Sequence, residues 1–469
     1  MSKRRKLMRI NTNMSALRSC YQLNNANDKL SKALERLSSG YKINSAEDNP
    51  VGAAIAQRLK TQLKGLDRAM QNASDGISVV ETAEGALNEV TDIVQRMREL
   101  AIKGANGTMS ASERQNIMDE VKQLQAEVDR ISESTEFNTR GLINGELSRR
   151  SYTDVVGTHV SYISDAVIAG KYELNVIKEA TYTEFTTGPV NIPASGIEHG
   201  GTISINGQSV KIEEGATLEQ VLDTLKGVAD LTDIAVNYNG TGIDFKSTIL
   251  GSNYPIKISC TDMLAGVLGI GIEEFAVGTD AVVEPVISGD NAFPASTTVE
   301  VDGNHVTLSA SENFEMRFNI DEGTTPATGN TVTVTALDIG TMVIQMGANE
   351  GQIMDINIPE VSCAAMGIDK LNLHTEAGCD RAMDLLDSAL TYVTQVRSKL
   401  GAYSNRMDYA VRSLSVTNEN MTAALSRIED ADMAMEMTNF TSQQVITQAA
   451  NSMLAQANQL PEKVLQLLQ

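Results

Sequence analysis

The sequence predicts a mainly α-helical frame that carries a β-rich insert. Residues 11 to about 140, and again from about 366 to the end, place apolar residues at helical spacing, and each of these arms contains a single proline. Between about 150 and 360 the chain is rich in Thr, Val, Ile, Gly and Asp, and stretches such as TISINGQSVKIEE and NTVTVTALDI predict hairpins. We therefore expect the N- and C-terminal helices to pair as a long coiled coil or helical bundle, with one or more central α+β domains projecting outward.

The N-terminal arm should open with a coiled-coil helix. Its apolar positions alternate by four and three with one slip near Asn24, a pattern typical of a seam with a stutter. Gly40 is expected to end this helix, and Asn49 and Pro50 to cap and begin the next one. That second helix, from 50 to about 106, would be roughly 80 Å long at 1.5 Å per residue, so it needs other helices beside it.

Small residues interrupt the long helix. Gly65, Gly76 and Gly85 each cost about 1 kcal/mol of helix propensity, and we expect them to let neighbouring helices approach closely. A shorter helix, about 112–132, should follow the turn KGANGTMS. The C-terminal arm carries a matching apolar stripe that should pack beside these helices: Leu385, Ala389, Val393, Val396, Leu400, Tyr403, Met407, Val411 and Leu414.

Composition excludes several classes of partner. The formal net charge of the 469 residues is −22, from 38 Lys and Arg against 60 Asp and Glu, which argues against nucleic acid or an anionic membrane surface. No apolar run approaches the roughly 18–20 residues of a membrane span, so no membrane insertion is expected. The start, MSKRRKLMRINTN, has no apolar h-region, so we expect no cleavable signal peptide and export by another route.

No pattern of reactive residues predicts an enzyme, a metal site or a cofactor. The four histidines stand apart, without H-E-x-x-H or a cysteine at metal-ligand spacing. The four cysteines also follow no metal or redox spacing, and we expect them to be small buried hydrophobes. Cys379 lies near a helix start, where the pKa of a thiol can fall. For this cysteine, as for the others, we favour an inert packing role. These positions are His159, His199, His305, His374, Cys20, Cys260, Cys363 and Cys379.

The two ends of the chain raise a question of partners. From Thr441 to Gln469 only Glu462 and Lys463 are charged. A two-helix pair of segments 8–40 and 430–469 cannot offset about 1–2 kcal/mol per residue of backbone ordering, so both ends should be disordered in a monomer and packed in an assembly of copies. An ordinary core helix in a monomeric bundle is the alternative, but the chain offers no third helix to cover both ends. The expected polymerisation core is Leu17, Leu30, Leu37, Val445, Met453, Leu460, Val464 and Leu467.

Many long motifs, in order, resemble bacterial flagellin. They include INTNMSAL, LERLSSGYKINSAEDNPVGAAIAQRL, QRMRELAIKGANGT, LGAYSNRMDYA, SRIEDADMAMEMTNFT and SMLAQANQLPEKVLQLL, and they cover both arms, roughly 8–150 and 340–469. In the middle, ISINGQSVKIEEGATLEQVLDTLKG and the residues after it, at about 201–250, look like the small β-α-β module inserted in many flagellins. Flagellins usually begin at the equivalent of Met8, so we interpret MSKRRKL as a misplaced start.

The resemblance implies a layered structural subunit of the extracellular flagellar filament, which serves swimming motility. Residues 1–47 with 425–469 would form the terminal coiled-coil core, and 48–180 with 340–424 a long-helix bundle with a β-hairpin. Residues 181–339 would form the insert that faces solvent. It also implies copies of the chain itself as partners, a flagellar export chaperone, the filament cap and hook-junction proteins, and export unfolded through the type III apparatus of the flagellum.

The resemblance further implies recognition by the vertebrate Toll-like receptor that senses flagellin. The family's receptor-binding residues match Arg96, Leu100 and Glu120. On exposed helix faces, the arginine and glutamate suit charge-assisted hydrogen bonds and the leucine suits an apolar anchor. The alternative is that this surface packs protofilament against protofilament. Both hold if the monomer binds the receptor and the intact filament does not.

Two other functions stay open at this point. A hook–filament junction protein shares both terminal motifs, and an adhesin or enzyme could be carried on a flagellin frame if the insert binds glycans. Whether the insert is one module or two is also open, with ISGDNAFPAS near residue 290 as the candidate joint.

Overall fold

A computed structural model describes residues 12–468, apart from residues 165, 194–195, 288–291, 312–313, 322, 324–330 and 338, and describes side chains as far as residue 459. The expected start at Met8 and the side chains of Leu460, Val464 and Leu467 therefore lie outside the described residues. Contacts divide the chain into two compact units, Met1–Ala73 with Gln345–Ile353 and Tyr409–Gln469, and Ser74–Ile344 with Met354–Asp408. The helices α2 (Pro50–Gly104) and α6 (Glu376–Glu429) each contribute residues to both units.

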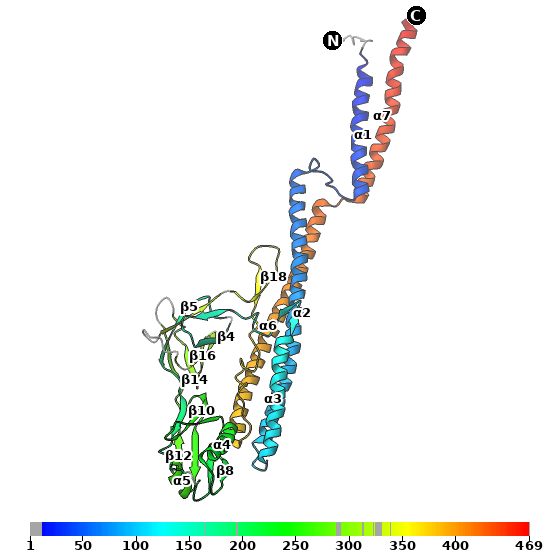
Figure 1. Ribbon diagram of the computed structural model, residues 1–469. Coiled ribbons are helices and arrows are strands. Elements are labelled where there is room, and N and C mark those ends of the chain that lie inside the picture. The colour runs from blue at the N-terminus through cyan, green and yellow to red at the C-terminus, as the bar shows by residue number, and fades with distance from the viewer. Residues whose placement is uncertain are drawn as a thin grey trace. The chain divides into compact units, whose positions relative to one another are not determined.

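The first unit contains the helix pair formed by the two ends of the chain. Helices α1 (Met14–Ser39) and α7 (Met433–Leu468) lie side by side and antiparallel (Figure 1). Gly40 ends α1 in the left-handed conformation, at φ 77°, as predicted. Helix α2 (Pro50–Gly104) begins at the predicted proline, and the Asn49 side chain accepts a hydrogen bond from the Gly52 amide at 3.0 Å.

The C-terminal arm is divided where the sequence predicted continuity. Helix α6 (Glu376–Glu429) ends before α7 begins, and the Asp432 carboxylate between them accepts hydrogen bonds from the amides of Ala434 and Met435, at 3.0 and 3.1 Å. This carboxylate caps a new helix start. Conversely, α7 continues past Pro461, which removes one backbone donor without ending the helix.

The second unit contains the helical bundle. Helix α3 (Ala111–Ser134) begins with a capping box between Ser110 and Glu113. Ion pairs connect its neighbour α2 to α3 and to α6. The apolar stripes expected on the three helices are buried, including Leu87, Val90, Val94, Met97, Val121, Val128, Val393, Val396 and Leu400. Along the chain, two short hairpins lie between the helices and the β-rich middle: β1 (Glu136–Phe137) with β2 (Arg140–Gly141), and β18 (Met342–Gln345) with β19 (Ile353–Ile356).

The three helical glycines differ in their surroundings. A Cβ added at Gly65 would lie 2.9 Å from the Ala348 Cβ, and one at Gly76 would lie 2.3 Å from the Ile344 Cδ1, so both positions allow a close approach of the segment around the β18–β19 hairpin. At Gly85 a Cβ would meet no described atom within 4 Å. The expectation of close packing is therefore wrong at Gly85.

The β-rich middle contains two modules with separate hydrophobic cores. The outer module pairs two antiparallel four-stranded sheets, β13-β5-β17-β3 and β14-β15-β16-β4, around one core. The sequence NTVTVTALDI does not form a hairpin: its strand, β17, pairs with β5 and β3 instead. The strands are β3 (Ser151–Thr153), β4 (Thr158–Ile163), β5 (Gly170–Lys178), β13 (Val282–Pro285), β14 (Thr298–Asp302), β15 (His305–Ala310), β16 (Phe314–Ile320) and β17 (Thr331–Ala336).

The inner module is nested within the chain of the outer one. Its sheets, β6-β10-β9 and β12-β11-β7-β8, enclose a second core together with helices α4 (Leu218–Ala229) and α5 (Asp262–Leu268). The predicted TISINGQSVKIEE hairpin is confirmed as β7–β8, with Asn206 and Gly207 at positive φ in its turn. The strands are β6 (Tyr182–Thr186), β7 (Gly201–Ile205), β8 (Gln208–Ile212), β9 (Ile234–Tyr238), β10 (Ile243–Leu250), β11 (Ile256–Cys260) and β12 (Glu273–Ala276).

The joint between the modules lies where the chain leaves and re-enters the outer one. Thr181 and Thr279 form an antiparallel bridge there, and the Thr181 amide donates to the Thr279 carbonyl at 2.8 Å. The joint expected near residue 290 is wrong, because Phe293 belongs to the outer core, with its ring centroid 5.2 Å from that of Tyr172.

Candidate functional site

The seam between α1 and α7 is built from small side chains. Ala26 and Ala33 of α1, and Ala450 and Ala457 of α7, are buried between the two helices. The Asn13 side-chain amide donates to the Ala457 carbonyl at 2.8 Å across the pair. Alanines bring two backbones close but bury little apolar area, so this seam alone stabilises the pair weakly.

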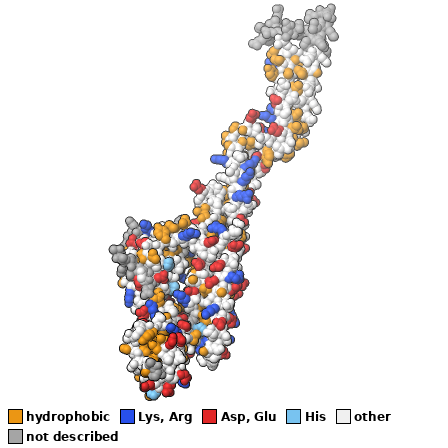
Figure 2. Space-filling view, viewed as in Figure 1, with side chains coloured by type: hydrophobic (Ala, Val, Ile, Leu, Met, Phe, Trp, Pro, Cys, Tyr) orange, Lys and Arg blue, Asp and Glu red, His pale blue; other side chains and the backbone are white. Residues whose placement is uncertain are grey.

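Many large apolar side chains of both helices are exposed outside this seam. Their exposed fractions run from 44% to 65%, and Figure 2 shows hydrophobic surface along the terminal helix pair. So many exposed large apolar side chains on one helix pair are typical of a surface that contacts another protein. The outward-facing apolar residues are Met14, Leu17, Tyr21, Leu34, Met433, Met435, Met437, Val445, Ile446 and Met453.

The expected core residues fall into three groups. Leu17, Val445 and Met453 lie on the outward face. Leu30 and Leu37 are half-buried on α1. Leu460, Val464 and Leu467 lie on α7 beyond the described side chains.

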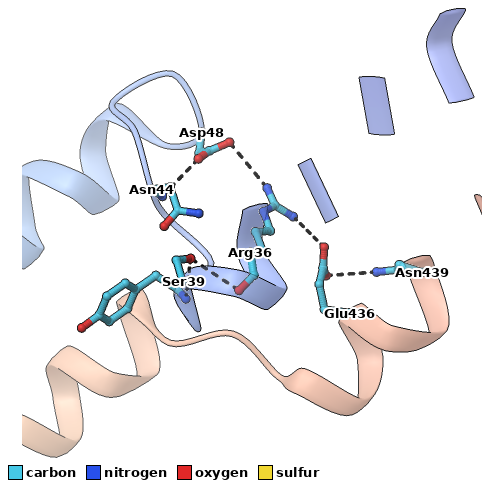
Figure 3. A network of polar contacts seen from close by, with 7 residues as sticks. Arg36, Ser39, Asn44, Asp48, Glu436 and Asn439 are labelled. Carbon is cyan, nitrogen blue, oxygen red and sulfur yellow. Dashed lines mark hydrogen bonds and ion pairs between the residues drawn. The ribbon is translucent and has the colours of Figure 1, made fainter. Parts of the chain in front are cut away.

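Ion pairs between charged side chains connect the end of α1 with the start of α7. Figure 3 shows Arg36 of α1 between two carboxylates, with its guanidinium 3.6 Å from Asp48 and 3.7 Å from Glu436 of α7. Nearby, Lys60 of α2 lies 2.5 Å from Glu429 of α6. All three carboxylates are largely buried, with side chains 11–13% exposed. The elbow cluster, as we name Arg36, Asp48, Lys60, Glu429 and Glu436, is a set that the sequence pattern did not single out.

Backbone contacts reinforce the elbow cluster. The Lys42 amide donates to the Glu429 carbonyl at 2.6 Å, and the Ala431 amide donates to the Gly40 carbonyl at 2.9 Å. The hydrogen bond from the Asn44 amide, with that from the Ser45 amide and the nearby Arg36 charge, holds the pKa of Asp48 below its ordinary value, although partial burial acts to raise it. The residues between α1 and α2 are therefore held to the start of α7 by main-chain and side-chain bonds together.

The residues expected to bind a receptor lie on α2 and α3, but not all on the surface. The side chains of Arg96 and Glu120 are 51% and 45% exposed, and the guanidinium Nη2 lies 2.9 Å from the carboxylate Oε1. The hydrogen bonds to Glu120 and Glu99 raise the pKa of Arg96 further. Leu100, the expected apolar anchor, is only 3% exposed and lies in the helical core.

The cysteines have free thiols in two kinds of environment. Cys260, Cys363 and Cys379 are buried as expected, whereas Cys20 of α1 is exposed. Burial raises the pKa of Cys379 to about 11, so its position near the start of α6 does not activate it. Among the described residues, no group of three or more His, Cys, Asp and Glu could hold a metal ion. None of the described helices combines the length and hydropathy that crossing a bilayer requires.

Comparison with known proteins places this chain in a family. Residues 10–148 match the bacterial flagellin N-terminal helical region, and residues 383–468 match the C-terminal helical region. Flagellin A of Vibrio cholerae serotype O1 is 34% identical over 98% of this chain and 99% of its own length, and flagellin A of Vibrio anguillarum is 33% identical with the same coverage. The structure of FliC from Burkholderia pseudomallei covers 71% of this chain and 99% of its own, at 17% identity and a TM-score of 0.24. The chain therefore belongs to the bacterial flagellin family and is a structural subunit of the extracellular filament that serves motility, not an enzyme.

Proposed function

We propose that the helix pair α1–α7 is the surface on which copies of this flagellin polymerise, and that the filament is layered around it. Residues 1–47 with 425–469 form the core of the filament, 48–180 with 340–424 the next layer, and 181–339 the part that faces solvent. The observation that supports this most directly is the set of exposed large apolar side chains on α1 and α7. Such surface becomes stable when neighbouring copies cover it.

The polar residues of α7 support the same proposal. Its stretch 441–459 carries no charged side chain, but it is rich in Gln, Asn, Ser and Thr. In a helical polymer each side chain meets equivalent side chains of its neighbours, so a charge would face like charges in every subunit. Amides and hydroxyls can hydrogen-bond across such contacts without that repulsion.

Val445→Glu tests the assembly surface. The Val445 side chain is 64% exposed, so the charge should leave the monomer folded, yet it would have to be buried at a contact between copies. We expect the critical concentration for polymerisation to rise at least about tenfold. The matched control is Val156→Glu in the outer module, where the valine is 95% exposed and polymerisation should not change. Polymerisation of Val445→Glu at the wild-type concentration would overturn the proposal.

Receptor recognition is a second proposed function. The exposed ion pair between Arg96 and Glu120 supports it, since both groups can form charge-assisted hydrogen bonds with a partner. Leu100 is left out, because its burial places it beyond the reach of a partner. The partner is the vertebrate Toll-like receptor that senses flagellin, and it binds the monomer.

Monomer and chemically cross-linked filament should therefore bind the receptor ectodomain differently. We expect binding to the monomer only, weakened at least about tenfold by Arg96→Ala or Glu120→Ala. Glu127→Ala, which removes an exposed partner of Arg130 elsewhere on α3, is the control. Equal binding by monomer and filament, or no effect of either substitution, would contradict the proposal.

Membership of the family supports further partners. We include among them an export chaperone for the C-terminal segment, the filament cap, the hook-junction proteins, and export through the flagellar type III apparatus without a cleavable signal peptide. Pull-down of the full chain, with and without residues 430–469, from cells that express these components tests the chaperone directly. Loss of the chaperone only in the shortened chain is the expected result, and unchanged capture would contradict it.

A further inference from the structure

Helix α6 carries a polar and aromatic stripe beside its apolar one. Arg381, Tyr392 and Lys399 are separated by eleven and seven residues. At about 100° per residue these spacings return to within roughly 20° of the same direction, so the three side chains leave α6 on one face. None of them belongs to the apolar stripe that the sequence predicted.

The first contact of this stripe is with the outer β module. The Tyr392 ring meets Tyr162 of β4 edge to face, at 5.9 Å between centroids and 85° between planes. The Arg317 guanidinium of β16 lies 5.1 Å from the Tyr392 centroid and 5.5 Å from that of Tyr162. The Lys399 ammonium donates to the Tyr162 hydroxyl at 3.2 Å. Cation–π and charge-assisted contacts of this kind hold the module on α6.

The second contact is with the inner module. The Arg381 guanidinium lies 5.1 Å from the Tyr254 centroid and donates to the Asn253 carbonyl at 3.4 Å. Just before α6, the Asn372 side-chain amide donates to the Asp233 carboxylate at 2.7 Å and to the Leu231 carbonyl at 2.9 Å. Two stretches near the start of α6 therefore bind the same edge of the inner module.

Both contacts are formed by groups outside the two module cores. The hydrophobic core of the outer module consists of residues between 163 and 336 and takes one residue, Leu250 of β10, from the inner module; the core of the inner module consists of its own residues between 197 and 270. Beside the first contact, a groove of about 820 Å³ separates the outer module from α6, with Ser164 and Ser309 on one wall and Gln395 and Arg406 on the other. No residue of α6 belongs to either module core, and the contacts with α6 are cation–π, hydrogen-bonded and aromatic; the Tyr392 ring is buried at the first contact, with the groove beside it.

We propose that this stripe is an internal docking surface whose partner is the insert of the same chain. The outer module binds α6 through the contact around Tyr392, which we name the aromatic seat. The inner module binds through the contacts of Asn372 and Arg381, which we name the inner seat. Both contacts open while the two modules stay folded. In the seated state the insert covers one face of α6 in every subunit. In the released state that face is open to solvent and to neighbouring molecules.

A charge exchange tests the inner seat in the full-length chain. Asn372→Asp places a second carboxylate where the amide now donates to Asp233, and like charges at this distance repel. We expect amides in residues 230–238 and 369–375 to exchange at least about tenfold faster, as measured by hydrogen exchange and mass spectrometry. The double variant Asn372→Asp with Asp233→Asn restores one amide and one carboxylate, though not the hydrogen bond to the Leu231 carbonyl, and should return exchange most of the way to the wild-type rate. Asn accepts the left-handed backbone of Asp233, at φ 58°.

The aromatic seat is tested by two substitutions at Tyr392. Tyr392→Phe keeps the ring and loses only the hydrogen bond from its hydroxyl to the Glu360 carbonyl, whereas Tyr392→Leu removes the ring between Arg317 and Tyr162. We expect Tyr392→Leu to raise hydroxyl-radical labelling of the Tyr162 side chain at least about tenfold above that of Tyr392→Phe, while the amides of β16, which pair with β15 and β4, stay protected from exchange in both variants.

Amides within the module cores separate release from unfolding. Strands β7 and β11, whose Ile203, Ile205 and Ile258 are fully buried, should stay protected in every variant. The proposal is overturned if these strands lose protection together with the seat, since the contact would then be part of the fold. It is also overturned if Asn372→Asp leaves exchange unchanged, or if the double variant fails to restore it.

Discussion

Leu100 lies one helical turn beyond Arg96 on α2, yet the two side chains have opposite environments: the leucine is 3% exposed and the arginine side chain 51%. The resemblance to flagellin placed both at a receptor surface, but residues four positions apart on a helix point only in neighbouring directions, and the boundary between core and solvent runs between them. The exposure of the cysteines was equally hidden: Cys20 is exposed and the other three are buried, but their local sequences did not distinguish them. At this scale, exposure determines whether a side chain can bind a partner.

Substitution at these two positions should separate stability from recognition. Leu100→Ala should lower the free energy of unfolding by about 2–5 kcal/mol, because it leaves a cavity in the helical core. Arg96→Ala should change it by less than about 1 kcal/mol, because the ion pair is solvent-exposed. Urea unfolding followed by circular dichroism gives both values. A Leu100→Ala variant of wild-type stability would show that the position is not buried in solution.

Two helical glycines make a matched pair at the same scale. Gly85→Ala should raise the free energy of unfolding by up to about 1 kcal/mol, because the new methyl group meets nothing within 4 Å and alanine favours the helix. Gly76→Ala should gain less or lose stability, because its Cβ would lie 2.3 Å from the Ile344 Cδ1 and 2.8 Å from the Met407 Sδ. Thermal unfolding of the two variants side by side measures the difference, and Gly76→Ala as the more stable of the two would contradict it.

At the scale of elements, local signals in the sequence were reliable and long-range ones were not. Gly40, Asn49 and Pro50 act within a few residues of themselves, and the ends that they predicted are observed. The joint at Thr181 and Thr279, by contrast, unites residues almost a hundred positions apart, and no local pattern marks it. The elbow cluster and the α6 stripe could not be predicted from local sequence either, because their partners come from distant segments of the chain.

The elbow cluster should stabilise the terminal helix pair. Arg36→Ala leaves Asp48 and Glu436 largely buried without their shared cation, and we expect a loss of about 1–2 kcal/mol for the pair. Arg18→Ala, an exposed arginine on the same helix, is the control and should have no such effect. Hydrogen exchange across 14–39 measures both variants, and equal rates in the two would argue against a role for the cluster.

The inner seat should respond to acid through His374. Burial, and secondly the charge of Lys122 on α3, lower the pKa of this imidazole, while Asp233 and Asp119 act against them. The folded state therefore binds the proton less readily than the unfolded state, so stability present above the ordinary value near 6.5 falls as the pH drops below it. Burial raises the pKa of Asp233, which has the opposite effect, but that group is present in both proteins compared below.

The comparison is between the wild type and His374→Gln. From about pH 7.5 to about pH 5.5 the wild type should lose more unfolding free energy than the variant, measured by urea titration at each pH. Equal losses would mean that His374 does not carry the acid sensitivity.

At the scale of the whole molecule, the middle of the chain buries its own apolar side chains, whereas the two ends leave many of theirs exposed. The two β modules have hydrophobic cores, whereas α1 and α7, among their described residues, fully bury only alanines between them and expose many of their larger apolar side chains. In dilute monomer we expect amides of 14–39 and 433–459 to exchange about a hundredfold faster than in the filament, while the module cores keep the same rates in both states. Strong protection of both ends in the monomer would remove the physical basis for assembly through this surface.

The bridge between Thr181 and Thr279 has a practical consequence. Both passages of the chain at this point are already held by a backbone hydrogen bond of 2.8 Å, so the span between them can be replaced by a short connection while the surrounding sandwich keeps its strands. In the filament proposed above, where residues 181–339 face solvent, a foreign polypeptide inserted at these two threonines would be displayed once per subunit. This topology thus makes the inner module a position at which the filament subunit can carry a foreign polypeptide.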